Sequence, residues 1–380
     1  MKLLHLSDLH IGKRVNEFSM LEDQKHILTQ ILEITDRERP EGILLAGDIY
    51  DKPVPPTEAV QMLDDFFTEL AERNLAVFAV SGNHDSPERL SFGSRLFQSK
   101  GLYLLSIYDG QERGIVLEDE YGTVTIHLLP FVKPSVMRHV FIKEEIPTCE
   151  AAVELAVRHM KVDRRERNVL VAHQFVTGAR RCESEELQIG GVDQVSASVF
   201  DDFDYVALGH LHSPQSVGRE TVRYCGTPLK YSFSEADQEK SVTVVELEEK
   251  GCVKVRQIPL KPIRDMRKIR GTYMEVTNRS FYEGTNTEDY IHAVLTDEED
   301  IPDGIQKLRV IYPNILRLEY DNLRTRESRE IAGTDHAEEK TELELFEEFY
   351  KLQNNQAMSL QQRAYMEQMI EDLRGESQEI

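Results

Sequence analysis

The stretch SGNHD, residues 81–85, directly follows the apolar run 75–80. A short apolar run that ends at a Gly-Asn pair is typical of a buried strand followed by a sharp turn. Because α/β folds bind ligands at the carboxyl ends of their strands, this turn would present Asn83 and His84 at a binding edge. Taken alone, the pattern favours a purely structural turn, and the rest of the chain decides between the two interpretations.

Apolar runs alternate with helical patterns before this turn. The runs at 2–6 and 42–46 predict two more strands, and apolar residues at helical spacing predict helices at 19–38 and 56–74. Strand, helix, strand, helix, strand is the pattern of an α/β domain with adjacent parallel strands. Further strands are expected at 124–129, 168–172, 204–208, 222–224, 242–247 and 253–258, and a further helix at 149–161.

The pattern changes after residue 262. Short strands and one short helix predict a small α+β domain, a polar stretch predicts a linker, and two amphipathic helices follow. The strands are expected at 271–276, 290–295 and 316–320, and the helices at 304–311, 342–354 and 360–373. The predicted domains are therefore 1–262, 263–322, a linker at 323–340 and a helical segment at 341–375.

The formal net charge of −23 argues against binding nucleic acid through the whole surface. The charge is uneven, since residues 331–380 hold twelve acidic and four basic side chains. The four cysteines form no CxxC pair, which favours a reducing, cytoplasmic setting over a disulfide framework or a zinc ribbon. No apolar run approaches the roughly 20 residues of a membrane helix, and we expect no signal peptide.

Five predicted strands end in residues that can bind a metal. Each motif alone would more often be an ordinary surface, capping or hydrogen-bonded residue, but the occurrence of all five together favours a metal site. Alternate residues at a strand end project the same way, so Asp-x-His and His-x-His each present two ligands together. Mixed carboxylate, imidazole and amide ligands suit Mn²⁺, Fe²⁺ or Zn²⁺ better than Mg²⁺. The residues are Asp8 with His10, Asp48 with Asp51, Asn83 with His84, His173, and His210 with His212.

Two neighbouring metal ions can clamp a phosphate for in-line attack. His84 follows a candidate ligand directly and is the natural proton donor for the leaving oxygen. Three functions remain open on these residues: a DNA nuclease, a small-molecule phosphodiesterase or protein phosphatase, and a structural subunit that binds DNA ends. The additional domains after the catalytic one argue against the second, and the complete ligand set argues against the third.

The order Asp-x-His, Gly-Asp, Gly-Asn-His-Asp, His and Gly-His-x-His resembles the calcineurin-like metallophosphoesterases. Within that superfamily the chain is similar to the SbcD nuclease subunits. The similarity runs from residue 1 to about 260, where the motifs are highly specific, and more loosely through the tail. The stretches that carry the similarity are LHLSDLHIGK (4–13), LLAGDIYDK (44–52), GNHDSPERL (82–90), ALGHLHSPQ (207–215) and YCGTPLKYSFSE (224–235). The resemblance implies an α/β sandwich of two mixed sheets flanked by helices, a small α+β capping domain and a C-terminal helical tail.

The resemblance also implies two divalent metal ions, commonly Mn²⁺, and a role for each site residue. His84 would be the catalytic histidine, and Asp51 would orient a ligand or His84. For Asp85 both a direct role and capping of the turn stay open, and capping is favoured. One metal would be held by Asp8, His10 and His212, the other by Asn83, His173 and His210, with Asp48 bridging the two.

The activity that the resemblance implies is ATP-independent single-stranded DNA endonuclease together with 3′→5′ duplex exonuclease. The substrates would be DNA ends and hairpins in recombination, repair and replication. An SbcC-type ATPase would be the partner in a heterotetramer, and a homodimer would form through helices such as 56–73 or 88–100. The apolar side chains expected to face the ATPase are Leu343, Leu345, Phe346, Phe349, Tyr350, Leu360, Tyr365, Met366, Met369, Ile370 and Leu373.

Basic side chains near the site turns are candidates for phosphate contacts, with a solvated surface as the alternative for most. The sequence shows no stripe of interleaved aromatic residues of the kind that stacks single strands. We expect Lys13 and Arg89 to contribute before the others. The full set is Lys13, Arg14, Lys52, Arg89, Arg95, Arg180 and Arg181.

Overall fold

The computed structural model divides the chain into two compact units, Met1–Asp265 and Met266–Ile380. It describes residues 1–111, 114–182, 185, 194–323, 325, 341–354 and 358–376. Most of the predicted linker at 323–340 lies outside the described residues.

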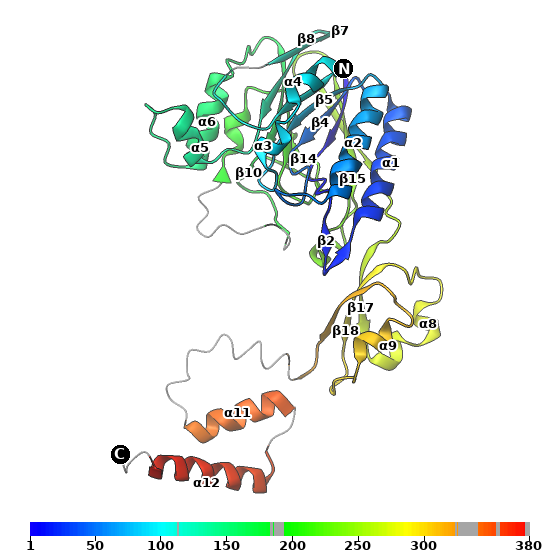
Figure 1. Ribbon diagram of the computed structural model, residues 1–380, viewed down its shortest axis with the longest axis vertical. Coiled ribbons are helices and arrows are strands. Elements are labelled where there is room, and N and C mark those ends of the chain that lie inside the picture. The colour runs from blue at the N-terminus through cyan, green and yellow to red at the C-terminus, as the bar shows by residue number, and fades with distance from the viewer. Residues whose placement is uncertain are drawn as a thin grey trace. The chain divides into compact units, whose positions relative to one another are not determined.

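Two six-stranded sheets form the larger unit, with helices α1 and α2 beside one sheet and α5 and α6 beside the other (Figure 1). The first sheet has the order β16-β15-β1-β4-β5-β6, in which β1, β4, β5 and β6 run parallel. Its strands are β1 Lys2–Leu6, β4 Gly42–Ala46, β5 Ala76–Val80, β6 Leu102–Leu105, β15 Ser241–Leu247 and β16 Val253–Pro259.

The second sheet has the order β13-β14-β12-β9-β8-β7, with β14, β12, β9 and β8 parallel and an antiparallel strand at each edge. Two mixed sheets flanked by helices are the fold class expected from the sequence, and the expectation is confirmed. The strands are β7 Ile115–Asp119, β8 Gly122–Leu129, β9 Arg167–His173, β12 Tyr205–Gly209, β13 Gln215–Val217 and β14 Arg219–Tyr224.

Local sequence signals explain the helix boundaries. Helix α2 begins after the Pro55-Pro56 pair, and the Thr148 hydroxyl caps α6 by accepting the Ala151 N–H at 3.1 Å. Short two-stranded pairs lie beside the main sheets. The helices are α1 Leu21–Glu38, α2 Thr57–Glu72, α3 Pro87–Leu90, α4 Ser94–Phe97, α5 Pro134–Val140 and α6 Cys149–His159, and the short strands are β2 Arg14–Val15, β3 Phe18–Ser19, β10 Phe175–Val176 and β11 Gln194–Val195.

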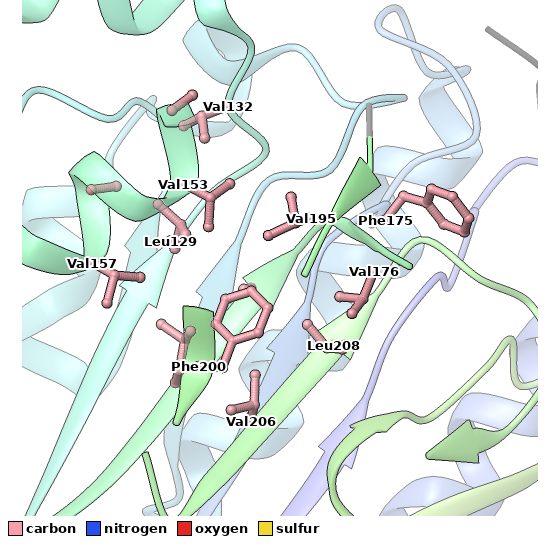
Figure 2. Packing of buried hydrophobic residues seen from close by; sticks show 14 of the residues in the cluster. Leu129, Val132, Val153, Val157, Phe175, Val176, Val195, Phe200, Val206 and Leu208 are labelled. Carbon is pink, nitrogen blue, oxygen red and sulfur yellow. The ribbon is translucent and has the colours of Figure 1, made fainter. Parts of the chain in front are cut away.

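Two of the buried layers in the larger unit share β12. Because alternate residues of a strand face opposite ways, Tyr205 and Ala207 face the first sheet while Val206 and Leu208 face α6. Figure 2 shows the second layer, where Val153 of α6 lies beside Leu129 of β8, and Phe200 lies beside Val206 of β12. Burying each such aliphatic or aromatic side chain contributes about 1.5–3 kcal/mol, so both faces of the sheet hold the strand ends in place.

The smaller unit contains a parallel three-stranded sheet, β17 Met266–Gly271, β18 Tyr290–Leu295 and β19 Ile315–Tyr320. The strand predicted at 271–276 is wrong: β17 ends at Gly271 and α7 Tyr273–Val276 follows. The reason is a capping box, in which the Thr272 hydroxyl accepts the Glu275 N–H and the Glu275 carboxylate accepts the Thr272 N–H. The other helices are α8 Arg279–Tyr282 and α9 Gly304–Leu308.

Helices α11 Glu342–Asn354 and α12 Leu360–Glu376 enclose an apolar groove. The Gln362 side chain donates to the Tyr350 hydroxyl at 2.8 Å, and Arg363 pairs with Glu347 at 2.9 Å, which join the two helices. The groove is lined by Phe346, Tyr350, Met358, Gln361, Gln362, Tyr365 and Met366. None of the helices in the described part of the chain has the length and apolarity needed to cross a bilayer.

Candidate metal centre

The five predicted strand ends meet where the two sheets face each other. The loops after β1, β4 and β5 come from neighbouring parallel strands of the first sheet, and β9 and β12 are neighbours in the second. The contacts that join the two sides there include the His173 ring, 2.9 Å from the Ala46 carbonyl oxygen, and the His210 N–H, which donates to Asp8 Oδ1 at 2.9 Å. Tertiary structure therefore gathers the residues of all five motifs.

Four of these residues have a backbone conformation that side chains rarely adopt. Asp8, His10, Asp48 and His210 have φ values of 51°, 44°, 47° and 109°. Positive φ costs a non-glycine residue free energy, and such strain is concentrated at functional sites. The surrounding hydrogen bonds hold the strained turns, and the strain is an independent sign that their side-chain directions matter.

Two glycines permit the close approach of the site loops. A Cβ on Gly82 would lie 2.0 Å from Asp48 Oδ1, and one on Gly209 would lie 1.8 Å from the Ala46 carbonyl oxygen. Both separations are far below van der Waals contact. Glycine is thus required at each position for backbone to pack against the neighbouring loop.

Asp48 lies at the middle of the cluster. Its Oδ2 is 3.5 Å from His173 Nε2 and 3.7 Å from His10 Nε2. It belongs to two groups of close donor atoms, one with His10 and His84 and one with Asp8 and His173. A carboxylate shared by two groups is the arrangement that a bridging ligand requires.

Asn83 organises the second side of the cluster. Its Oδ1 lies 3.0 Å from His173 Nε2 and 2.8 Å from His210 Nδ1. The second nitrogen of His173 is taken by the Ala46 carbonyl, which fixes the proton on Nδ1 and leaves Nε2 as the lone-pair donor. The amide oxygen and the two imidazoles therefore converge on one point.

The donor atoms fit divalent metal ions. His10 is fully buried, yet among the described residues neither of its ring nitrogens has a hydrogen-bond partner. Burial lowers the pKa of His10 and His210 and lowers that of His173 to about 3, so these rings are neutral lone-pair donors. Burial also raises the pKa of Asp48 to about 6. A buried, unpartnered imidazole beside buried carboxylates is what a cation would satisfy.

His84 differs from the other histidines of the cluster. Its side chain is 24% exposed, its Nδ1 lies 3.0 Å from the Asp51 carbonyl oxygen, and its Nε2 lies 3.9 Å from Asp48 Oδ2. The Nδ1–H donates to that carbonyl, so Nε2 faces the cluster. Asp51 thus touches His84 through its main chain, while its carboxylate pairs with Lys13 Nζ at 2.7 Å.

His212 is held by residues that sequence reasoning missed. Its Nδ1 lies 3.3 Å from Glu235 Oε1, and its main-chain N–H donates to Glu185 Oε1 at 2.7 Å. Glu235 is fully buried and also accepts a 2.7 Å hydrogen bond from Lys240. Burial acts to raise the pKa of Glu235, but the hydrogen bond from His212 and the charge of Lys240 outweigh it and lower that pKa to about 2.

One available signal pointed to Glu235, because this residue closes the stretch 224–235 whose motif had no assigned role.

Asp85, by contrast, behaves as expected of a capping residue. Its carboxylate accepts the main-chain N–H groups of Ile49, Tyr50 and Gly82 at 2.9–3.1 Å. Asp85 therefore holds the 81–85 turn against the loop that carries Asp48.

Comparison with known proteins places long stretches of the chain in two protein families and beside relatives that include a nuclease subunit. The calcineurin-like phosphoesterase family matches residues 1–214, and the family described as "Type 5 capsule protein repressor C-terminal domain" (SbcD_C) matches residues 262–354. The SbcD subunit of the SbcCD nuclease from Staphylococcus epidermidis is 34% identical over 366 residues, which cover 94% of this chain and 95% of that protein. The crystal structure of TT1561 of Thermus thermophilus covers 67% of this chain and 98% of its own, at 13% identity and a TM-score of 0.39.

Proposed function

The chain belongs to the calcineurin-like phosphoesterases and to the family of SbcD nuclease subunits, and from this membership we propose that it cleaves DNA. Membership makes it a metal-dependent phosphodiesterase. The observation that carries the proposal is the convergence of Asp8, Asp48, Asn83 and the buried histidines between two sheets. Divalent metal ions bound there would polarise a phosphodiester and activate water.

We propose a ligand assignment in which two ions share Asp48, the residue that belongs to both groups of close donor atoms. His10, Asp8 and His212 would hold one ion, and Asn83, His173 and His210 the other, with Asp48 shared. The unpartnered ring of His10 and the meeting of His173 and His210 at the Asn83 oxygen support this division. We propose Mn²⁺ as the metal, in keeping with the mixed oxygen and nitrogen donors.

We assign proton transfer to His84. The Asp51 carbonyl holds the Nδ1 proton, so Nε2 is the atom that faces the cluster and exchanges a proton with the leaving oxygen. Its partial exposure allows the proton to be replaced from solvent, which the fully buried His10 and His173 cannot do. His84 can therefore act on substrate without being required to hold metal.

The specific activities that we propose are endonuclease on single strands and 3′→5′ exonuclease on duplex ends. We propose that the protein cleaves hairpins together with an SbcC-type ATPase. The apolar groove between α11 and α12 supports a protein partner, since apolar residues line it and the helices carry acidic side chains that disfavour DNA. We propose that the unit from 263 to 322 caps the DNA, and that the protein acts in the cytoplasm.

We also propose a homodimer through helices such as 56–73 or 88–100. Phe92 and Leu96 are 84% and 76% exposed, and Val60 on α2 is 46% exposed. Large apolar side chains that are exposed together mark protein interfaces more often than plain surface. Sedimentation of the purified protein tests this: a Leu96→Glu variant should shift a dimer toward monomer, and a wild-type monomer at every concentration would refute the proposal.

The central experiment is cleavage of linear duplex and hairpin DNA with Mn²⁺, alone and with the ATPase subunit plus ATP. His84→Ala should abolish cleavage while the bound metal, measured by elemental analysis, stays at the wild-type level. His139→Ala is the matched control, because this histidine is exposed on α5 and its ring nitrogen bonds to the Ser135 carbonyl within the same helix.

Other outcomes separate the alternatives. Hydrolysis of bis-p-nitrophenyl phosphate without any cleavage of DNA would favour a small-molecule phosphodiesterase. If the wild type binds DNA ends and neither it nor His84→Ala cleaves them, the protein is a structural end-binding subunit.

A further inference from the structure

Two aromatic side chains cover the histidines on the Asn83 side of the metal centre. Phe131, from the loop after β8, stacks on His210 with ring centroids 6.2 Å apart and meets His173 edge-on at 6.0 Å. Phe175 comes from a different element, β10, and its ring centroid lies 6.2 Å from that of His210. Figure 2 shows Phe175 beside Val176 at one end of the buried cluster. Both rings are therefore fixed by packing directly against candidate ligands.

Each of these rings carries a cation on its face. Lys133 Nζ lies 5.5 Å from the centroid of Phe131, and Arg181 Cζ lies 3.7 Å from the centroid of Phe175. Both cationic side chains are exposed. Attraction to the ring quadrupole favours these positions over the many rotamers open to a free lysine or arginine, so the charges are held near the centre before substrate arrives.

Neither cation is neutralised by a carboxylate in the described part of the chain. Lys13, in contrast, forms an ion pair with Asp51 at 2.7 Å, and Lys240 forms one with Glu235 at 2.7 Å. The chain has a net charge of −23, yet these two cations lie on the two aromatic rings that contact His210, a candidate metal ligand. The proximity of Arg181 also contributes to the lowered pKa of His210, after burial and neighbouring histidines.

We propose that Lys133 and Arg181, set on Phe131 and Phe175, bind the DNA phosphates next to the one that is cleaved. This inference rests on the proposed DNA-cleaving function and adds the contacts that place the strand. A backbone contact is sequence-independent, and it supplies the local positive charge that an acidic protein needs to hold a polyanion. It also changes the sequence-based expectation, which placed Lys13 and Arg89 first: Lys13 is paired, and Lys133 was not among the candidates.

The test is equilibrium binding of a fluorescein-labelled duplex, measured by anisotropy over a range of salt concentrations. Each phosphate contact contributes about 0.9 to the slope of log affinity against log salt on duplex DNA, so Lys133→Ala with Arg181→Ala should lower the slope by about 1.8. The matched control is Lys143→Ala with Arg158→Ala, which removes the same charge from exposed positions away from the centre.

Kinetics give a second readout. The test pair should raise the KM for DNA more than it raises the KM for bis-p-nitrophenyl phosphate, because the small diester has no neighbouring phosphate to contact. Elemental analysis should find the same bound metal in both pairs. A slope and KM equal to those of the control pair would overturn the inference, even if the wild type cleaves DNA. If the slope of the double variant is lowered as expected but the wild type cuts no DNA, the binding site is retained and the proposed function is refuted instead.

Discussion

Replacing Glu235 with glutamine tests how the protein sets the ring of His212. Glu235 uses both oxygens: Oε1 lies 3.3 Å from His212 Nδ1, while Oε2 accepts from Lys240 at 2.7 Å and from the Thr227 hydroxyl at 3.3 Å. Glutamine has a single acceptor oxygen. The bond to the charged Lys240 is the stronger one, so the glutamine amide N–H₂ would face His212.

The consequence for His212 follows from its two tautomers. A donor opposite Nδ1 favours the tautomer with its proton on Nε2, and that proton blocks the nitrogen that faces the metal centre. Loss of a hydrogen-bond partner behind a metal ligand weakens metal binding by about 10–100-fold, or roughly 1.4–2.7 kcal/mol. Glu235→Ala should do more, because it also leaves the buried Lys240 without its counter-charge, at a cost of about 3–5 kcal/mol in the free energy of unfolding.

Two measurements separate these effects. Calorimetric titration of the metal-free protein with Mn²⁺ reports affinity, and urea unfolding of the same metal-free samples reports stability. Glu239→Gln is the matched control, since this neighbouring glutamate is exposed and its loss changes net charge equally. A Glu235→Gln protein that binds Mn²⁺ as tightly as Glu239→Gln would refute the tautomer argument, whatever its stability.

Three further outcomes are expected. His84→Ala should lower kcat on DNA by about 10²–10⁴-fold, the usual contribution of a general acid, with KM for DNA changed little; an equal kcat would remove His84 from the chemistry. Gly82→Ala should displace Asp48, because the added Cβ would lie 2.0 Å from its carboxylate, and elemental analysis should find both metal positions depleted. Asp119→Asn should lower the free energy of unfolding at pH 7 by about 2 kcal/mol, because it removes a charged partner of the buried Arg167. The hydrogen bond from Arg167 lowers the pKa of Asp119 in the folded protein. The stability that the pair contributes is therefore present above the pKa of an unfolded Asp, near 4, and is lost as the pH falls through the lowered pKa of the folded protein. The urea midpoints of the wild type and Asp119→Asn should converge in acid and stay apart at neutral pH.

Short-range patterns identified most of the elements of the larger unit correctly. β1 and β4 occupy the residues expected of them, because each is a short, mainly apolar run that a Ser or Gly follows directly. The same reasoning failed at 271–276, where Thr272 and Glu275 form a capping box that starts a helix. A capping box involves two polar side chains, so a search for apolar periodicity overlooks it.

The candidate site divides in the same way. Residues whose motif lies at a strand end, such as Asn83 and His210, could be proposed as ligands from order and spacing alone. Glu235 and Lys133 could not, since neither follows a strand end with a recognisable ligand pattern. Each acquires its place through a contact that the fold creates, Glu235 with His212 and Lys133 with Phe131.

Local periodicity and residue type predict the class of fold and the kind of chemistry at the strand ends, because both are properties of short segments. The arrangement of that chemistry depends on tertiary packing. Facing two sheets brings His173 against Ala46 and His210 against Asp8, makes Asp48 common to both donor groups, and leaves the His10 ring buried without a hydrogen-bond partner among the described residues. These facts depend on packing between segments more than a hundred residues apart, where the approach of two backbones is set by glycines and buried side chains on both.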